Sequence, residues 1–216
     1  TEHDLGQHRV HVALGARGLG TVLDLRTSAE VEILGPGPLR ATPVKHVHLD
    51  LIPHGFEGRS VLDRTIPDED APEHGVDHLY LDYVRDAPDE VATALRTVAD
   101  PHSGAVLVHC AAGKDRTGVL VALALSLVGV RRDAVVADYT RTDERIEGIV
   151  GRLLGEPLYA EHAGGRELDS FRPHAWNMER FLDRVDSEYG GVHGLAMSIG
   201  VDEETVARLS RRLLDV

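Results

Sequence analysis

The chain has 216 residues, of which 42% are hydrophobic, and this length and composition suit one globular domain with a sizeable core. Its formal net charge of −13 excludes general electrostatic binding of nucleic acid, so an anionic ligand has to be held locally. A single cysteine excludes an internal disulfide framework and a multi-cysteine metal site, and it indicates a reducing, cytoplasmic location.

The basic residues are almost all arginines, since only Lys45 and Lys114 are lysines. This bias, together with abundant Ala, Gly and Val, is typical of a GC-rich bacterial genome. The longest apolar run, Val119 to Val130, is interrupted by Ser126 and Gly129 and is shorter than the roughly 18 residues that a membrane span needs. We therefore expect no stable insertion into a membrane.

The chain opens with a predicted strand, helix and second strand. The apolar run Thr21–Leu25 predicts the first strand, and Ser28 is a suitable N-cap for a helix over Ala29–Leu34. A Gly-Pro-Gly-Pro breaker ends this helix. Alternation over Val44–Leu51 predicts the second strand.

Several polar residues of this first part have structural interpretations. His46 and His48 share one face of the second strand, but no third ligand follows at zinc-site spacing, so we expect neither a metal nor another cofactor. We interpret Arg26 and Glu30 as a structural ion pair near the sheet edge. Asp24 is likewise expected to be structural.

The middle of the chain predicts a long loop and then a helix. Pro53–His78 is rich in Pro, Gly, Asp, Glu and His without periodicity, and connections this long are usually functional, so we expect a substrate-side loop. A helix opens at Asp86–Glu90 and ends at Asp100. Its apolar face consists of Val91, Ala94, Leu95 and Val98.

The second half combines one strand with several helices. Ala105–His109 is an apolar strand that runs directly into Cys110, and Arg116–Val128 is a helix too apolar to lie at the surface. Three further helices are expected to begin at Asp133, Pro173 and Asp202, the first of them running towards Ile149. Strands that alternate with helices predict a parallel sheet covered on both faces.

The loop between that strand and that helix reads His109-Cys-Ala-Ala-Gly-Lys-Asp-Arg-Thr-Gly118. A strand-to-helix loop directs several backbone N–H groups inward, and the helix N-terminus adds positive potential, which together suit a tetrahedral dianion. Gly113 permits the tight path of the chain. The residues expected to bind the phosphate are His109, Ala111, Ala112, Gly113, Lys114 and Thr117.

Cys110 and Arg116 supply the predicted chemistry. The helix N-terminus, the loop amides and Arg116 all stabilise negative charge at Cys110, which favours the nucleophilic thiolate. The guanidinium of Arg116 can bind two equatorial oxygens of a phosphoryl group at once. The hydroxyl of Thr117 can assist departure of the thiolate. The sequence therefore predicts a phosphomonoester hydrolase that works through a phosphocysteine intermediate and releases inorganic phosphate.

The general acid that protonates the leaving oxygen has more than one candidate. Asp115 lies beside Arg116 in the loop and is preferred, although two neighbouring cations make it a poorer proton donor unless the phosphate dianion offsets them. The alternatives are Asp50, His54 and an acid within Pro53–His78.

The loop resembles the Cys-x5-Arg signature of protein tyrosine phosphatases, and Gly113–Gly118 is similar to the bacterial tyrosine and lipid phosphatases of mycobacterial type. The similarity extends to Asp24–Glu30, Val136–Tyr139, Tyr189–Gly191 and Leu195–Ile199. The resemblance implies one phosphatase domain over residues 1–216 with an α/β, phosphotyrosine-phosphatase-like fold. Its mostly parallel central sheet would be flanked by helices, with a helical lid over about residues 141–173. Relatives also carry Asp at the position of Asp115.

Two departures from the family pattern are visible. The family usually has a strand and an Asn-Phe-Arg-Asp motif upstream of the residues that match Thr1–Leu5. Without them we expect an unpaired sheet edge, which points to a partial gene product or to an oligomer that covers the edge. The second departure is His54, which stands where relatives place a candidate acid after a proline.

Two other functions are compatible with a loop cysteine. A rhodanese-like sulfurtransferase does not explain Arg116 and Thr117 at the start of the helix, and a non-catalytic phosphate-binding module does not explain Cys110 and Asp115. For the phosphatase, the sequence leaves open phosphoprotein substrates with phosphotyrosine, phosphoserine or phosphothreonine, and phosphoinositides. Lys114 is expected to favour phosphoinositides by reaching a second phosphate on the inositol ring.

Overall fold

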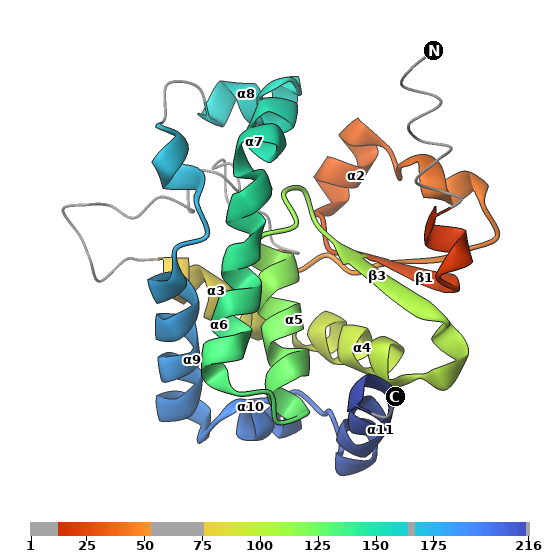
Figure 1. The fold of residues 1–216 in the computed structure, drawn as a ribbon, viewed down its shortest axis with the longest axis vertical. Helices are drawn as coiled ribbons and strands as arrows, with labels where there is room; N and C mark the ends of the chain where they lie inside the picture. Colours follow the sequence, from red (N-terminus) through yellow and green to blue (C-terminus); the bar gives the residue numbers. More distant parts are fainter. Residues whose placement is uncertain (1–12, 53–75, 164–166, 215–216) are drawn as a thin grey trace.

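A small parallel sheet positions the loop of interest (Figure 1). The computed structural model describes residues 13–52, 76–163 and 167–214, and in these ranges three strands pair in the order β2–β1–β3. They are β1 (Leu19–Asp24), β2 (Lys45–His48) and β3 (Ala105–His109), and both neighbours run parallel to β1. The expected α/β fold, with a parallel sheet flanked by helices, is confirmed.

The carboxyl ends of the three strands meet at one edge of the sheet. Asp24 at the end of β1 lies level with His48 of β2 and with His109 of β3. The pairing continues beyond the strands, because Leu25 N donates to His109 O at 2.8 Å and Leu49 N donates to Asp24 O at 2.9 Å. This edge is where ligands bind in open α/β sheets.

The helices pack around the sheet and around one another, with α5 in their midst. It contacts α3, α4, α6, α10 and α11, and its residues Val119, Leu120 and Leu123 are buried in the main core. The helices have these bounds: α2 (Ser28–Leu34), α3 (Val76–Asp86), α4 (Pro88–Ala99), α5 (Asp115–Leu127), α6 (Arg132–Thr140), α7 (Ile146–Leu154), α8 (Pro157–Ala163), α9 (Ala175–Tyr189), α10 (Val192–Ser198) and α11 (Glu203–Leu214).

Most predicted elements are present close to their predicted bounds. The three strands, α4 and α5 agree within a few residues, and β3 spans the predicted Ala105–His109. Asp202 accepts a hydrogen bond from Thr205 N at 2.8 Å, so it caps α11 as expected. Within the described residues, the outer edges of β2 and β3 pair with no further strand.

The predicted cap of α2 was wrong. Thr27, not Ser28, is the N-cap, because its Oγ1 accepts from Glu30 N at 3.1 Å while Glu30 Oε2 accepts from Thr27 N at 2.7 Å. This reciprocal capping box satisfies two backbone donors of the first turn. It also fixes the Glu30 side chain over the start of α2.

The helix predicted from Asp133 towards Ile149 is broken. It begins as α6 and stops at Thr140, where a 3-10 turn (Arg141–Arg145) separates it from α7. The break allows α7 to form a small core of its own, in which Ile146 and Val150 pack with Phe171. Between residues 141 and 173 the described chain is largely helical, as expected, and α7 and α8 extend beyond the α5–α6 pair (Figure 1).

Helix α3 was missed. The loop predicted over Pro53–His78 lies mostly outside the described residues, and α3 begins at its end, at Val76. The apolar residues of α3 do recur at spacings of three and four, at Val76, Leu79, Tyr80, Tyr83 and Val84, but the polar, Gly- and Pro-rich stretch before them hides where the helix begins. The residues buried there are Leu79, Tyr80, Leu81, Tyr83 and Val84.

Gly118 permits α5 and α6 to pack closely. A Cβ at this position would lie 2.8 Å from Cδ2 of the Tyr139 ring, which real Cβ atoms essentially never approach. The close approach places the hydroxyl of Tyr139 on α6 within 2.7 Å of the Tyr80 hydroxyl on α3. The glycine of the loop signature therefore serves packing beneath the loop.

We expect Gly118→Ala to destabilise the protein by about 1–3 kcal/mol, because the added methyl group overpacks the α5–α6 contact. Thermal unfolding followed by circular dichroism measures this as a lowered Tm. Gly151→Ala on α7 is the matched control, since a methyl group added there would have no neighbouring atom within 4 Å among the described residues. The control should gain roughly 0.5–1 kcal/mol from helix propensity. Equal losses in both variants would contradict the close approach.

Candidate active site

Cys110 directly follows β3 at the carboxyl edge of the sheet and is 7% exposed. The loop turns at Gly113, whose φ of +69° lies in the left-handed region that favours glycine. Lys114 is the N-cap of α5. Within the part of the chain that the structure describes, no side chain caps this helix, so its first N–H groups keep no side-chain partner there. The predicted strand, loop and helix N-terminus thus come together around Cys110.

Arg116 is held by a buried carboxylate. Its Nη1 donates to Glu30 Oε2 at 2.6 Å and to Leu25 O at 3.2 Å, and its Nη2 donates to Glu30 Oε1 at 3.0 Å. Arg116 is 2% exposed and Glu30 is 3% exposed. This bidentate pair joins the first turn of α5 to the first turn of α2.

Each member of this pair favours the charged form of the other. Burial alone would raise the pKa of Glu30, but Arg116 and the hydrogen bonds to the carboxylate outweigh burial and lower that pKa to about 2. Burial would lower the pKa of Arg116, and Glu30 instead raises it. Both groups are therefore charged throughout the neutral range.

The expected Arg26–Glu30 ion pair was wrong, since each residue has another partner. Arg26 Nη2 lies 2.6 Å from Asp24 Oδ2, and Arg26 Nε lies 2.9 Å from Asp24 Oδ1. Burial alone would raise the pKa of Asp24, whereas the hydrogen bonds from Arg26, helped by His109, lower it. Arg26, which precedes the N-terminus of α2, also donates to Gly35 O at its C-terminus at 3.0 Å, so this side chain links the two ends of the helix. Asp24 thus has the structural contacts expected of it.

Lys114 and Asp115 both point into the protein. Lys114 is 7% exposed, its Nζ donates to Phe171 O at 2.9 Å and it lies 3.6 Å from Asp115 Oδ1. Asp115 Oδ1 also accepts from the Tyr80 hydroxyl at 2.6 Å, and that hydroxyl meets Tyr139 Oη at 2.7 Å. Burial, followed by the charge of Asp115, raises the pKa of Tyr80 well above its usual 10, so Tyr80 is a neutral donor.

Two hydroxyl groups near the loop are buried without a hydrogen-bond partner among the described residues. They are Thr117 Oγ1 on α5 and Tyr83 Oη on α3. Burial, followed by Asp115, raises the pKa of Tyr83 well above its usual 10, and the charges of Cys110 and Arg116 also act on it. A buried hydroxyl without a hydrogen-bond partner costs free energy, so both groups are candidate donors to a bound anion.

The remaining predicted residues lie at the margins of the site. His109 Nδ1 lies 3.2 Å from Cys110 O, and His109 Nε2 lies 3.8 Å from Asp24 Oδ1. Asp50 accepts from Ser28 N at 2.7 Å and from Ile52 N at 2.9 Å, which ties the end of β2 to α2. His54 lies outside the described residues. Asp50 is thus occupied by backbone contacts.

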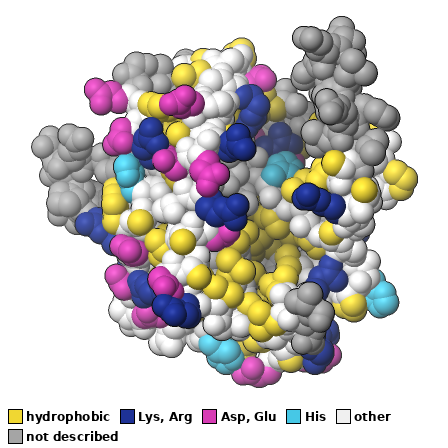
Figure 2. All heavy atoms as spheres, in the orientation of Figure 1, with side chains coloured by type: hydrophobic (Ala, Val, Ile, Leu, Met, Phe, Trp, Pro, Cys, Tyr) yellow, Lys and Arg dark blue, Asp and Glu magenta, His cyan; other side chains and the backbone are white. Residues whose placement is uncertain are grey.

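The α7–α8 segment (residues 146–163) reaches the loop from the side opposite α2. Arg152 Nη2 of α7 donates to Ala111 O at 2.6 Å, and Tyr159 Oη of α8 donates to Glu30 Oε1 at 2.7 Å. The surface is hollowed between this segment and α2, where Figure 1 draws the loop, and Lys and Arg side chains gather around the hollow (Figure 2). Basic side chains thus lie close to the loop despite the negative total charge of the chain.

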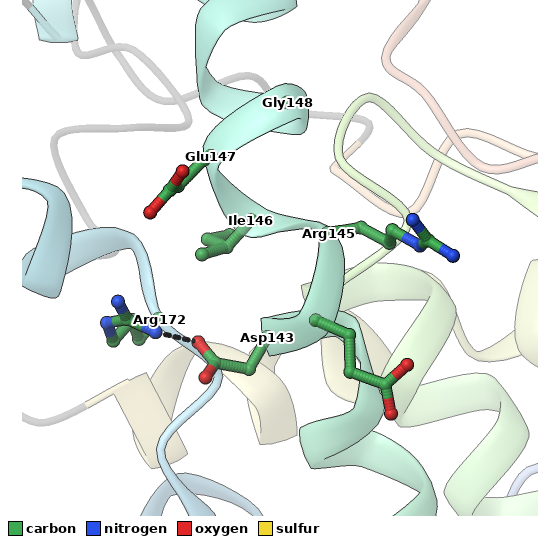
Figure 3. A pocket seen from close by; sticks show the side chains of 7 residues that line it. Asp143, Arg145, Ile146, Glu147, Gly148 and Arg172 are labelled. Atoms are coloured by element: carbon green, nitrogen blue, oxygen red, sulfur yellow. Dashed lines mark hydrogen bonds and ion pairs between the residues drawn. The ribbon is translucent and has the colours of Figure 1, made fainter.

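A pocket of about 410 Å³ lies at the base of α7 but contains no residue of the loop. Arg172 and Asp143 form an ion pair of 2.5 Å on one side of it, while Arg145 points away from that pair (Figure 3). Glu144 and Glu147 also line it, so its carboxylates outnumber its guanidinium groups. This pocket is not suited to a phosphate dianion.

The comparisons with known proteins decide the family. The model of the tyrosine phosphatase family matches residues 4–215. This chain belongs to the tyrosine phosphatase family. A tyrosine-protein phosphatase from Nostoc commune is 29% identical over 210 residues, which cover 93% of this chain and 68% of the relative. The triple specificity protein phosphatase PtpB of Mycobacterium tuberculosis is 28% identical over 230 residues, covering 91% of this chain and 83% of the relative.

Family membership establishes the broad activity of the chain. It is a phosphatase, a hydrolase that acts on a phosphorylated substrate and releases phosphate. Both relatives are bacterial, which supports the predicted bacterial origin. Among residues 13–52, 76–163 and 167–214, no helix has the length and apolar character needed to cross a membrane. In the same ranges no three His, Cys, Asp or Glu side chains are grouped so as to hold a metal.

Sequence reasoning missed three members of the site: the role of Glu30, and the hydroxyls of Tyr80 and Tyr159. Glu30 had a usable signal, because Thr27-Ser-Ala-Glu30 is a capping-box pattern that places the glutamate at a fixed position on the first turn. Tyr80 and Tyr159 lie 35 and 129 residues from their acceptors, and no local pattern indicates such contacts.

Glu30→Gln should cost about 3–5 kcal/mol of stability at pH 7, because it leaves the Arg116 charge buried without its counter-charge. The pKa of Glu30 is lowered from 4.5 to about 2, so the carboxylate's contribution is complete above about pH 4.5 and is lost as the pH falls towards 2. Urea unfolding at several pH values should therefore show the difference between wild type and variant shrinking below pH 4.5. Glu32→Gln, on the exposed side of α2, is the matched control and should change stability by less than about 0.5 kcal/mol. A difference independent of pH would argue against the charged pair.

Proposed function

We propose that this phosphatase hydrolyses phosphomonoesters through a phosphocysteine intermediate, with Cys110 as the nucleophile and Arg116 as the group that binds the phosphoryl oxygens. The observation that carries the proposal is that some N–H donors of Arg116 are bound by the protein and others keep no partner among the described residues. A guanidinium has five N–H donors. Three of them go to Glu30 and Leu25, through both hydrogens of Nη1 and one of Nη2. Nε–H and the second hydrogen of Nη2, which share one edge of the group, keep no partner among the described residues.

That remaining edge of Arg116 suits two oxygens of a transferring phosphoryl group. Its two donors are parallel and adjacent, the geometry in which arginine binds phosphate bidentately. Glu30 fixes the adjacent Nη1–Nη2 edge, so little ordering cost remains when the anion binds. Loop amides from Ala111 to Gly113 and the start of α5 would bind the other oxygens, and Thr117 Oγ1 is a further donor.

The reaction is proposed in two balanced steps. The Cys110 thiolate attacks phosphorus, an S–P bond forms, and the P–O bond to the leaving group breaks while an acid gives its proton to the leaving oxygen. Water then attacks phosphorus, returns a proton to the acid, and the S–P bond breaks to regenerate the thiolate and release inorganic phosphate. Stabilisation of the equatorial oxygens by Arg116 and the loop amides lowers both barriers.

We propose Asp115 as the acid. Its position next to Arg116 supports this role, and its hydrogen bond from Tyr80 and its 3.6 Å contact with Lys114 hold the carboxyl in one place. In the alternative candidate Asp50, both carboxyl oxygens already accept backbone N–H groups. Both contacts of Asp115 involve Oδ1, so its Oδ2 keeps no partner among the described residues, whereas neither oxygen of Asp50 is left without one.

The proposed substrate class is protein phosphotyrosine, on the strength of the family and of the relative named a tyrosine-protein phosphatase. Phosphoserine, phosphothreonine and phosphoinositides are second candidates from the sequence, and the relative named a triple specificity protein phosphatase supports a substrate range wider than one class. Lys114 is bound to Phe171 O, so contact with a second phosphate would require this hydrogen bond to break. A phosphate-release panel over these classes ranks the substrates.

Cys110→Ser should lower the turnover of para-nitrophenyl phosphate by at least about 10³-fold, because no neighbouring base ionises the serine hydroxyl. Binding of orthovanadate or phosphate should persist, since Arg116 and the loop amides are unchanged. Equilibrium dialysis measures the binding and absorbance measures the turnover. Near-normal turnover in this variant would reject the nucleophile. Slow turnover by the wild type with intact anion binding would instead favour a non-catalytic phosphate-binding module.

Asp115→Asn should slow phosphotyrosine hydrolysis far more than para-nitrophenyl phosphate hydrolysis, because the nitrophenolate leaves without protonation whereas the tyrosyl oxygen needs a proton. It should also flatten the basic limb of the pH–rate profile. Asp50→Asn is the comparison variant, and we expect it to lower stability without this leaving-group dependence. If Asp50→Asn or His54→Ala shows the dependence and Asp115→Asn slows both substrates alike, the acid lies in the preceding loop.

A further inference from the structure

Tyr159 connects the α7–α8 segment to the arginine of the site. It lies on α8, 129 residues from Glu30 in sequence, and its hydroxyl donates to Glu30 Oε1 at 2.7 Å. The same oxygen accepts from Arg116 Nη2 at 3.0 Å. One carboxylate oxygen is therefore shared between a residue of α8 and the guanidinium proposed to bind phosphate.

The four hydrogen bonds of the Glu30 carboxylate leave it one orientation. Oε2 accepts from Thr27 N and Arg116 Nη1, and Oε1 accepts from Arg116 Nη2 and the Tyr159 hydroxyl. A carboxylate has about four acceptor sites, so this group is saturated. Removal of the Tyr159 hydroxyl would open one site on the oxygen that fixes Nη2, the nitrogen at the phosphate-binding edge.

Burial strengthens the hydrogen bond between Tyr159 and Glu30. Tyr159 is 4% exposed and Glu30 is 3% exposed, so water does not compete for the bond. Burial, followed by the charge of Glu30, raises the pKa of Tyr159 above its usual 10, and the phenol remains a neutral donor. A hydrogen bond to a buried charged acceptor is stronger than one at the surface.

The other contacts between the loop and its surroundings on this side do not reach Arg116. Arg152 donates to the backbone oxygen of Ala111, and Lys114 donates to that of Phe171. Both contacts can hold the segment near the loop, but neither touches Glu30. Within the described residues, Tyr159 alone in the segment bonds to the carboxylate that orients Arg116.

We propose that Tyr159 is a positioning residue that couples the seating of α8 to the orientation of Arg116 through Glu30. With α8 seated, the Nε–Nη2 edge of Arg116 is held towards the loop, and with α8 displaced this edge loses part of its support. By linkage, an oxyanion bound at Arg116 stabilises the seated α8 by the same free energy that seating contributes to binding. The inference rests on the proposed function, in which Arg116 binds the phosphoryl group.

The test measures oxyanion affinity and α8 protection together. Tyr159→Phe keeps the ring and removes only the hydroxyl. It should raise the inhibition constant of orthovanadate about 3–30-fold, because only part of the roughly 10–150-fold that one hydrogen bond to a charged group is worth reaches the anion through Glu30. In the wild type, vanadate should slow amide hydrogen exchange at Tyr159 and Ala160, whose amides bond to Glu156 O, and this slowing should be lost in Tyr159→Phe. Arg152→Gln is the matched control, because it removes a segment contact that does not pass through Glu30. In that variant vanadate should still slow exchange in α8.

The outcomes separate this inference from the function on which it rests. Failure of vanadate to inhibit the wild type would count against the proposed function. A second outcome would overturn the role of Tyr159 alone. In it vanadate inhibits the wild type and Tyr159→Phe equally well, and it still slows exchange in α8 of the variant. Should Tyr159→Phe not fold, the wild-type exchange measurement decides, because no vanadate effect on α8 in an inhibited enzyme contradicts the coupling.

Discussion

The buried ion pair between Glu30 and Arg116 is the constraint on which the site depends. A guanidinium placed under a phosphate loop has to remain charged and hold one orientation, yet burial opposes its charge. Glu30 meets both needs, because its carboxylate neutralises Arg116 and binds one edge of it bidentately. The adjacent Nε–Nη2 edge keeps no partner among the described residues, and in the proposed mechanism it binds the phosphoryl oxygens without further ordering. Truncating either partner would leave an uncompensated charge in the core.

The fold can be understood as the means of bringing this pair together. Parallel pairing of β1 with β3 places the start of α2 beside the start of α5, because both helices follow strands that end at the same edge. The capping box at Thr27 holds Glu30 on the first turn of α2, and Leu25 O accepts a further bond from Arg116. A second layer, Tyr80 on α3 and Tyr139 on α6, holds Asp115. The close packing at Gly118 makes this layer possible.

The sequence predicted the parts of this arrangement that have local signatures. The strand, the loop with Cys110 and Arg116, and the buried α5 are contiguous in the chain, and each is defined by residue type and spacing. The partner of Arg116 was not predicted, because it lies 86 residues away and its pairing depends on strand order and helix docking. Glu30 does have a local signature in its capping box, but by residue type Ser28 is also a suitable cap and Arg26 a suitable ionic partner, and the predictions that named them were wrong. Helix α3 was missed although its apolar residues have helical spacing, because the polar, Gly- and Pro-rich stretch before it hides where the helix begins.

We propose that Cys110 carries the phosphoryl group between two chemical steps, in a site that the Glu30–Arg116 pair preorganises. Acid quench within the first turnovers of para-nitrophenyl phosphate hydrolysis, followed by peptide mass analysis, tests this role directly. We expect one phosphoryl group on the peptide that contains Cys110, lost again when the substrate is exhausted and absent in Cys110→Ser. Turnover that proceeds with the phosphoryl group on another residue, or with none on the protein under conditions that trap a cysteinyl phosphate, would contradict it.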